Sequence, residues 1–197
     1  MTAASCRAKA YTANTKSAVV AISTAHADAT WQAYIAKDHG FSFMAPGEVK
    51  ATLGTYRGAL AGPRQTIVYR SVDNNIEYKV TVMSFLQAQA EGASILGERE
   101  YAFQDKKKVL MDTFGRVESG KDTVYGRKLV VDQPDNKGRT TGAFYFTKGK
   151  MISLEATVLP ANGNYESPDP GRFVDSIVFV LSRADKNAVV LPSLRFE

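Results

Sequence analysis

Two carboxylates and one histidine are the residues of this chain that could perform acid–base chemistry. Glu77 and Glu155 lie on predicted strands and could form the carboxylate pair that glycosidases use, while His39 could act as a general acid or base. Lys79 and Arg70 are available as cross-strand partners for these carboxylates, so structural ion pairs are the preferred interpretation. No G-x-S-x-G turn points to a serine nucleophile. We therefore predict no catalytic residue.

Histidine and cysteine are too few to indicate a metal centre. The chain has 2 histidines and 1 cysteine, and both Cys6 and His26 lie within residues 1–29. Neither an H-x-x-H nor an H-E-x-x-H spacing is present, and no nucleotide-binding motif is found. The sequence therefore predicts neither a bound metal nor a cofactor.

Aromatic residues near the predicted hairpin are better candidates for binding. Tyr125 and Tyr145 could line a groove for a small molecule or a peptide, or could instead belong to the core. The loop 162–170 is polar and carries Tyr165, and loops of this kind often carry recognition. Together with Glu155 on the hairpin, these three tyrosines are the predicted binding residues.

The charge of the chain does not indicate nucleic-acid binding. Its 25 Lys and Arg residues exceed 20 Asp and Glu residues by 5, and this small excess is interpreted as spread along the chain. One group of basic residues could bind an anionic lipid or polymer, but nearby acidic residues favour an ordinary solvated face. The group comprises residues 106–108, Lys121, Arg127 and Lys128.

The first 29 residues differ in composition from the rest of the chain. They contain few large apolar side chains, several basic ones, and an Ala27-Asp28-Ala29 sequence that resembles a signal-peptidase site. We predict a signal peptide at 1–29, with a disordered tail as the alternative, and hence a periplasmic or secreted protein. A single domain is predicted at 30–180 and a C-terminal tail at 181–197. No apolar run is long enough to span a membrane.

A β-hairpin at 139–159 is the clearest structural prediction. Residues 139–148 alternate with period two and are rich in aromatic and β-branched side chains, which is typical of a strand. Gly149 suits a tight turn, and the return strand from 151 to 159 places Ile152 and Leu154 on a buried face. The opposite face, which carries Glu155, is expected to be more open.

One long helix is predicted from about Ser94 to Phe114. Apolar pairs recur every seven residues there, ending with Val109 and Leu110, and Gly115 suits the residue after a helix end. A short helix is expected after Asp169 and a brief helical turn at 31–35. The fold class is therefore α+β, a mainly antiparallel sheet flanked by one long helix and short terminal helices.

Several motifs resemble the PsbP-like fold group over about residues 38–180. They are the GFSF sequence at 40–43 followed by Pro46, the Tyr125-Gly126 pair, and the closing GRFVDSIVF at 171–179. This fold is shared by the extrinsic photosystem II protein and a Ran-GTPase-binding import factor, and the chain is more closely similar to uncharacterised secreted bacterial proteins of the group. The resemblance implies a central antiparallel sheet and a binding or assembly role rather than catalysis. No functional position is carried over from it.

These observations predict a secreted, non-enzymatic binding or assembly module of the bacterial cell envelope. Its partner would be an envelope protein or a small ligand. Two alternatives remain open at this point: a carrier that holds a small molecule in an aromatic cleft, and a hydrolase without a recognisable motif.

Overall fold

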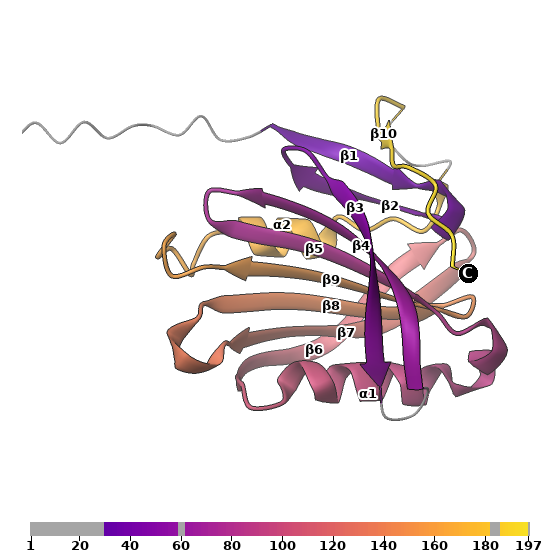
Figure 1. The fold of residues 1–197 in the computed structure, drawn as a ribbon, viewed down its shortest axis with the longest axis horizontal. Coiled ribbons are helices and arrows are strands. Elements are labelled where there is room, and N and C mark those ends of the chain that lie inside the picture. The colour runs from indigo at the N-terminus through magenta and orange to yellow at the C-terminus, as the bar shows by residue number, and fades with distance from the viewer. Residues whose placement is uncertain (1–29, 59–61, 182–185, 197) are drawn as a thin grey trace, which may run out of the picture.

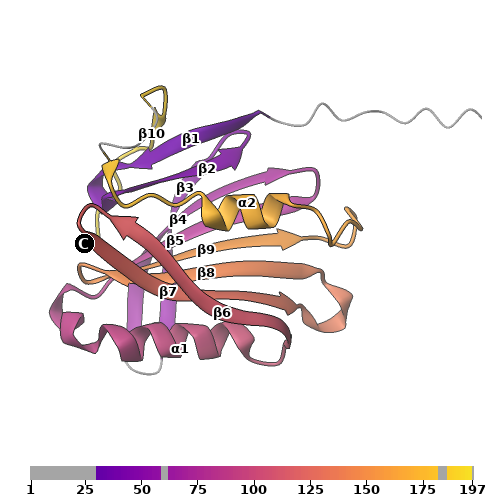
Figure 2. The same ribbon diagram turned by 180° about the vertical axis from the view of Figure 1, so that it is seen from behind.

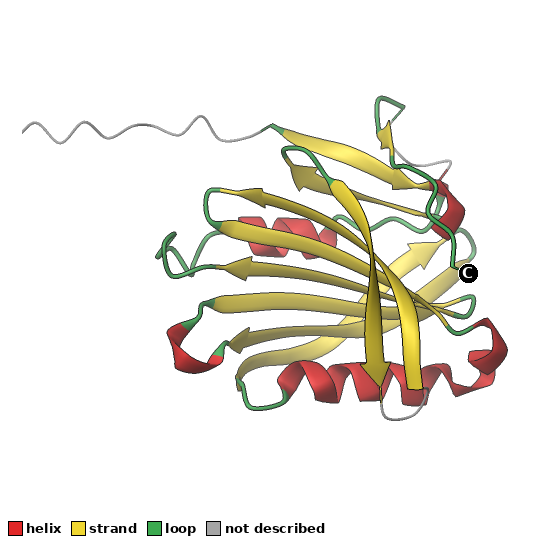
Figure 3. Cartoon of the chain, in the orientation of Figure 1, coloured by secondary structure: helices red, strands yellow, loops and turns green. Residues whose placement is uncertain are grey.

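The computed structural model describes residues 30–58, 62–181 and 186–196. Strands dominate this part of the chain (Figure 3). One sheet has seven antiparallel strands in the order β3-β4-β5-β9-β8-β7-β6, and a smaller sheet has the order β10-β1-β2. The strands are β1 (Trp31–Ala36), β2 (Phe41–Pro46), β3 (Lys50–Gly58), β4 (Gly62–Asp73), β5 (Ile76–Ser84), β6 (Lys108–Ser119), β7 (Asp122–Asp132), β8 (Arg139–Thr147), β9 (Lys150–Val158) and β10 (Val189–Val190).

The two faces of the large sheet are covered by different elements (Figures 1 and 2). Helix α1 (Gly92–Gln104) lies against one face, and helix α2 (Asp169–Asp175) lies against the other, beside the smaller sheet. Because side chains alternate along a strand, each central strand contributes to two separate apolar clusters. The cluster under α1 includes Ile95, Phe103, Leu129, Phe144 and Met151, and the other includes Phe43, Tyr69, Tyr78, Tyr145, Leu154 and Phe173.

The hairpin predicted at 139–159 is confirmed as β8 and β9, with Lys148 and Gly149 in the turn at φ 49° and 69°. The expectation that the second face of β9 is open was wrong. Met151 and Ser153 are buried on that face together with Glu155, because α1 covers it. Both faces of this strand are therefore interior.

The long helix predicted to Phe114 was wrong beyond residue 104. Asp105 leaves the helical region at ψ 125°, and Lys106 takes a left-handed φ of 58°, so the chain reverses. The following segment is β6, which pairs with β7 over its length. Val109 and Leu110, expected on the buried face of the helix, are 41% and 40% exposed in this strand. A short apolar run fits helix and strand alike, and the strand gains a ladder of backbone hydrogen bonds.

At the N-terminal end of the domain the structure differs from the prediction, and at the C-terminal end the predicted helix is present. Residues 31–35 belong to strand β1, paired with β2, instead of a helical turn. The short helix after Asp169 is confirmed as α2, and Phe173 is buried. Within the C-terminal tail, β10 pairs in parallel with β1 and Leu191 is buried, so this part docks on the domain.

The predicted signal peptide at 1–29 lies outside the described residues. Within the described ranges, no helix combines the length and apolar character that crossing a bilayer requires.

Candidate functional site

Strand β6 forms one edge of the seven-stranded sheet, and no described strand pairs with its outer side. In Figure 2 it runs across the front of the molecule, outside β7. An edge strand presents unpaired N–H and C=O groups, and proteins usually keep such edges short, bulged or charged. At 12 residues, β6 is as long as any strand of the described sheet. Its length makes it a candidate docking edge, although it carries a bulge and charged side chains.

Large apolar side chains are exposed along this edge. Phe114 is 81% exposed and Tyr125, on the neighbouring β7, is 66% exposed. Val109, Leu110 and Met111 are each about two-fifths exposed. Contiguous apolar exposure of this kind marks interaction sites more often than isolated exposed residues do. These five residues, with the outer backbone of β6, are called the β6 edge surface below.

A β-bulge shapes the first part of this surface. The register between β6 and β7 shifts between Val109 and Met111, so Leu110 is an extra residue in the strand. A bulge turns side chains out of the regular alternation, and these three consecutive apolar residues lie in a stretch, 108–114, that is exposed throughout. The bulge leaves the rest of the strand, from Met111 to Ser119, regularly paired with β7.

Aromatic and basic side chains alternate on the α1 side of the same edge. Phe114 lies opposite Arg127, and Arg116 lies opposite Tyr125. The guanidinium carbon of Arg127 lies 4.7 Å from the centre of the Phe114 ring. The Nε atom of the same arginine lies 3.2 Å from a carboxylate oxygen of Glu100 on α1. The cation–π contact and the ion pair hold Phe114 in a fixed position although its ring faces solvent.

Basic residues outnumber acidic ones in the segment 106–128, which includes β6 and the first part of β7. Residues 106–128 contain seven Lys and Arg residues and three Asp and Glu residues, which is a net charge of +4 within a chain of +5. Arg127 and Lys128 form ion pairs with Asp112 and Asp175. Within the described part of the chain, no ion pair is found for Lys106, Lys108, Arg116 or Lys121. The surface therefore favours a partner that carries negative charge.

A groove continues the β6 edge surface towards α1. It has a volume of about 530 Å³ and lies between the first turns of α1 and the adjoining ends of β7 and β8. Leu96, Phe146 and Tyr125 supply its apolar walls, and Tyr125 connects it to the edge. A partner bound at β6 could therefore extend a side chain or a loop into this groove.

The structure does not gather the four residues predicted to bind. Tyr125 lies on the β6 edge surface, whereas Tyr145 is buried on the opposite face of the sheet, with its ring over Gly126 and against Phe179. Tyr165 is partly buried under Arg139, whose guanidinium carbon lies 5.3 Å from the ring centre. β6 was not predicted because the apolar residues at 109–114 also fit the spacing of a helix.

Glu155, the fourth predicted residue, is part of a buried charge cluster beneath α1. Its carboxylate accepts a hydrogen bond from Arg99 and forms an ion pair with Lys79 at 3.0 Å. Burial opposes ionisation, but Arg99 and Lys79 outweigh it and lower the pKa of Glu155. Glu77 is bound separately by Arg70. The cross-strand pairs preferred from the sequence are confirmed, and each carboxylate is held by a basic partner of its own.

No family model matches the chain, and no curated protein sequence matches it. Among solved structures, the solution structure of cyanobacterial PsbP from Synechocystis sp. PCC 6803 is similar, with 14% identity, a TM-score of 0.46, and coverage of 76% of this chain and 92% of that chain. That protein belongs to the fold group that the sequence motifs resemble, and no residue role or partner is taken from it.

Proposed function

We propose that this protein is a secreted, non-enzymatic binding module of the bacterial cell envelope, which captures an extended segment of a partner protein. The segment would add to β6 as an eighth strand of the large sheet. The observation that carries this proposal is the open edge of β6, with its exposed apolar side chains and its unpaired basic ones. The Ala27-Asp28-Ala29 sequence supports secretion.

The edge also indicates the chemistry of the partner segment. In strand addition, backbone hydrogen bonds supply affinity and alternate side chains supply specificity. Met111 and Val109 would pack against apolar side chains of the segment, while Arg116 and Lys108 would attract acidic ones. We therefore expect an extended segment that carries both apolar and acidic residues.

Two features support binding over catalysis. Glu155 and Glu77 are both engaged by basic side chains, so neither is available as an acid or base without breaking an ion pair. Burial lowers the pKa of His39, whose ring lies between Tyr69 and Phe196, and the positive charge of Lys150 acts in the same direction. The histidine is thus enclosed by aromatic rings.

A small-molecule carrier is the second candidate function, and one observation favours it. The groove of about 530 Å³ has apolar walls that include Tyr125, the aromatic residue predicted from the sequence to line a cleft. A carrier would bind a small apolar molecule in the groove and would not bind an extended peptide at β6.

A synthetic peptide tests strand addition. An eight-residue peptide that alternates valine and glutamate should bind the protein, and Phe114→Ser should weaken this binding about tenfold or more, because it removes an aromatic contact from the centre of the edge. Fluorescence anisotropy of the labelled peptide measures both affinities. Leu53→Ser is the matched control: Leu53 is 51% exposed on β3, the opposite edge of the sheet, and its replacement should leave binding unchanged.

The sign of the peptide charge provides a second control. A peptide that alternates valine and lysine should bind much more weakly than the glutamate peptide, because residues 106–128 are positively charged. Equal affinity for the two peptides would contradict the proposal, and so would an equal loss of affinity in Phe114→Ser and Leu53→Ser.

A further inference from the structure

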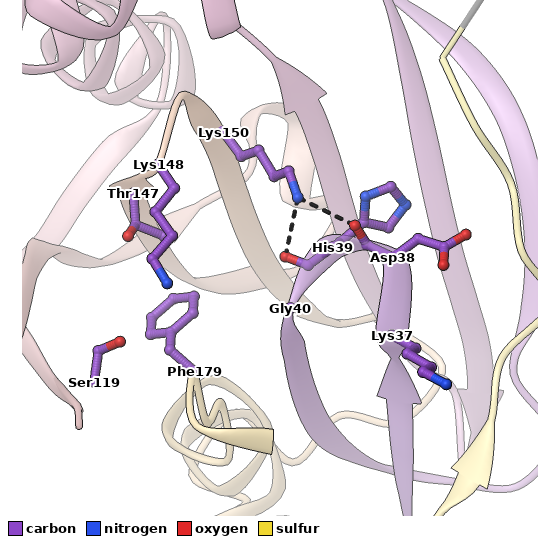
Figure 4. Close-up of a pocket in the computed structure, with 9 residues that line it drawn as sticks. All are labelled: Lys37, Asp38, His39, Gly40, Ser119, Thr147, Lys148, Lys150 and Phe179. Atoms are coloured by element: carbon purple, nitrogen blue, oxygen red, sulfur yellow. Dashed lines mark hydrogen bonds between the residues drawn. The ribbon is translucent and has the colours of Figure 1, made fainter. Parts of the chain in front are cut away.

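A small cavity, open to solvent on one side, lies beside the β8–β9 turn, at the end of β6 away from the bulge. Its volume is about 160 Å³. It is bounded by this turn, the last residue of β6, and the 3₁₀ turn η1 (Lys37–His39) between β1 and β2. Figure 4 shows the residues that line it. They are Lys37, Asp38, His39, Gly40, Ser119, Thr147, Lys148, Lys150 and Phe179.

The cavity contains positive charge that its lining does not neutralise. The side chain of Lys148 points towards Thr147, Ser119 and Phe179 in Figure 4. Asp38 provides the one carboxylate among the lining residues, and Figure 4 shows its side chain directed away from Lys148. That carboxylate accepts a hydrogen bond from Ser193 instead. The ammonium group of Lys148 therefore has no carboxylate partner in the lining.

Lys150 is the second ammonium group of this cavity and is held in place by the backbone. Its Nζ donates to the carbonyl oxygens of Asp38 and His39, at 3.2 and 3.3 Å. An ammonium group has three N–H donors, so one remains for a ligand. Burial lowers the pKa of Lys150, Asp38 opposes this, and the neighbouring charge of Lys148 lowers the pKa further. A bound anion would relieve the repulsion between the two lysines.

We propose that this cavity binds a small oxyanion, either phosphate or a short carboxylate, between the ammonium groups of Lys148 and Lys150. The hydroxyls of Ser119 and Thr147 line the same cavity and can donate to further oxygens of the ligand. Phe179 forms an apolar wall beside them, and its ring packs edge-on against Tyr145 at 5.8 Å between centroids. The volume of about 160 Å³ admits a ligand of this size. The cavity adjoins the groove beside α1, with which it shares Ser119, Thr147 and Lys148, but anion binding here does not depend on strand addition at β6.

Titration of the full chain with inorganic phosphate and, separately, with butyrate tests this site. Amide resonances of Gly40 and of 147–149 should shift with saturation in two-dimensional NMR spectra. Lys148→Asn should weaken binding at least tenfold, since it removes one ammonium group while asparagine tolerates the φ of 49° at this position. Lys106→Asn is the matched control, because Lys106 is also a lysine at positive φ, 58°, and lies outside the cavity lining.

Saturable shifts with phosphate alone would identify a phosphate site, and saturable shifts with butyrate would identify a carboxylate site that uses the Phe179 wall. Either result supports the proposal if the affinity for the anion falls in Lys148→Asn and not in Lys106→Asn. Shifts that do not saturate with either anion, or the same affinity in Lys148→Asn as in the unmodified chain, would overturn it.

Discussion

Replacing Glu155 by alanine should lower the free energy of unfolding by about 3–5 kcal/mol, because it leaves buried positive charge without a partner. Arg99 projects from α1 and is largely buried between the helix and the sheet, where it donates a hydrogen bond to Glu155, and Lys79 approaches the same carboxylate from β5. Chemical denaturation in urea measures the loss. The slope of the unfolding free energy against urea concentration should be the same in the variant and in the unmodified chain.

Glu77→Ala is the matched control for this prediction. Glu77 also pairs with an arginine on the neighbouring strand, but Arg70 is more than half exposed, so the pair contributes about 1 kcal/mol or less. A loss at Glu155 no larger than the loss at Glu77 would show that the buried cluster is not needed to hold α1 on the sheet.

The same cluster has a defined pH dependence. The pKa of Glu155 is lower in the folded state than its usual value of about 4.3, so its contribution to stability is present above that value and disappears as the pH falls through the lower folded pKa. The difference in unfolding free energy between the unmodified chain and Glu155→Ala should therefore shrink below about pH 4.

Gly126→Ala should destabilise the protein by about 4 kcal/mol or more, which places it among the most damaging single substitutions. A methyl group at this position would lie 2.1 Å from the carbonyl oxygen of Phe144 and 2.5 Å from the ring of Tyr145. Gly126 lies opposite Tyr145 in the β7–β8 ladder, so the backbone cannot move away without breaking the pairing that supports β6. Thermal unfolding followed by circular dichroism measures the effect.

Gly97→Ala separates this steric effect from the general effect of replacing glycine. Gly97 lies within α1, and no atom lies within 4 Å of the added methyl group. Alanine is favoured over glycine in a helix by about 0.5–1 kcal/mol, so this variant should be more stable than the unmodified chain. A Gly126→Ala variant as stable as Gly97→Ala would contradict the packing of Tyr145 over this glycine.

Local patterns of the sequence predicted the hairpin at 139–159 because alternation, aromatic residues and a glycine turn agree there. They failed at 105–114 because a seven-residue apolar spacing is also compatible with a strand when the run is short. The deciding features were the reversal at Lys106 and the pairing of β6 with β7, and the pairing joins residues up to 24 positions apart. The second face of β9 was wrongly predicted to be open, because no pattern in the sequence of the strand indicates that α1 covers it.

The candidate site was even less accessible from sequence. Whether a strand lies at an edge depends on the order of all strands in the sheet, which no local pattern contains. The basic residues at 106–108 were visible, but the turn between β6 and β7 is what places Arg127 and Lys128 beside Phe114 and Thr113 of the edge strand. Tyr125 was selected as an aromatic residue, and the structure places it, without Tyr145, on the β6 edge surface.

Hydrogen exchange of β6 in the presence of the valine–glutamate peptide tests strand addition most directly. The account predicts that amides of Met111 to Ser119 whose N–H groups point outward become protected, in alternation along the strand, while amides of β3 are unchanged. Protection confined to residues of the α1 groove, such as Leu96 and Thr123, or no change along β6 at saturating peptide, would contradict it.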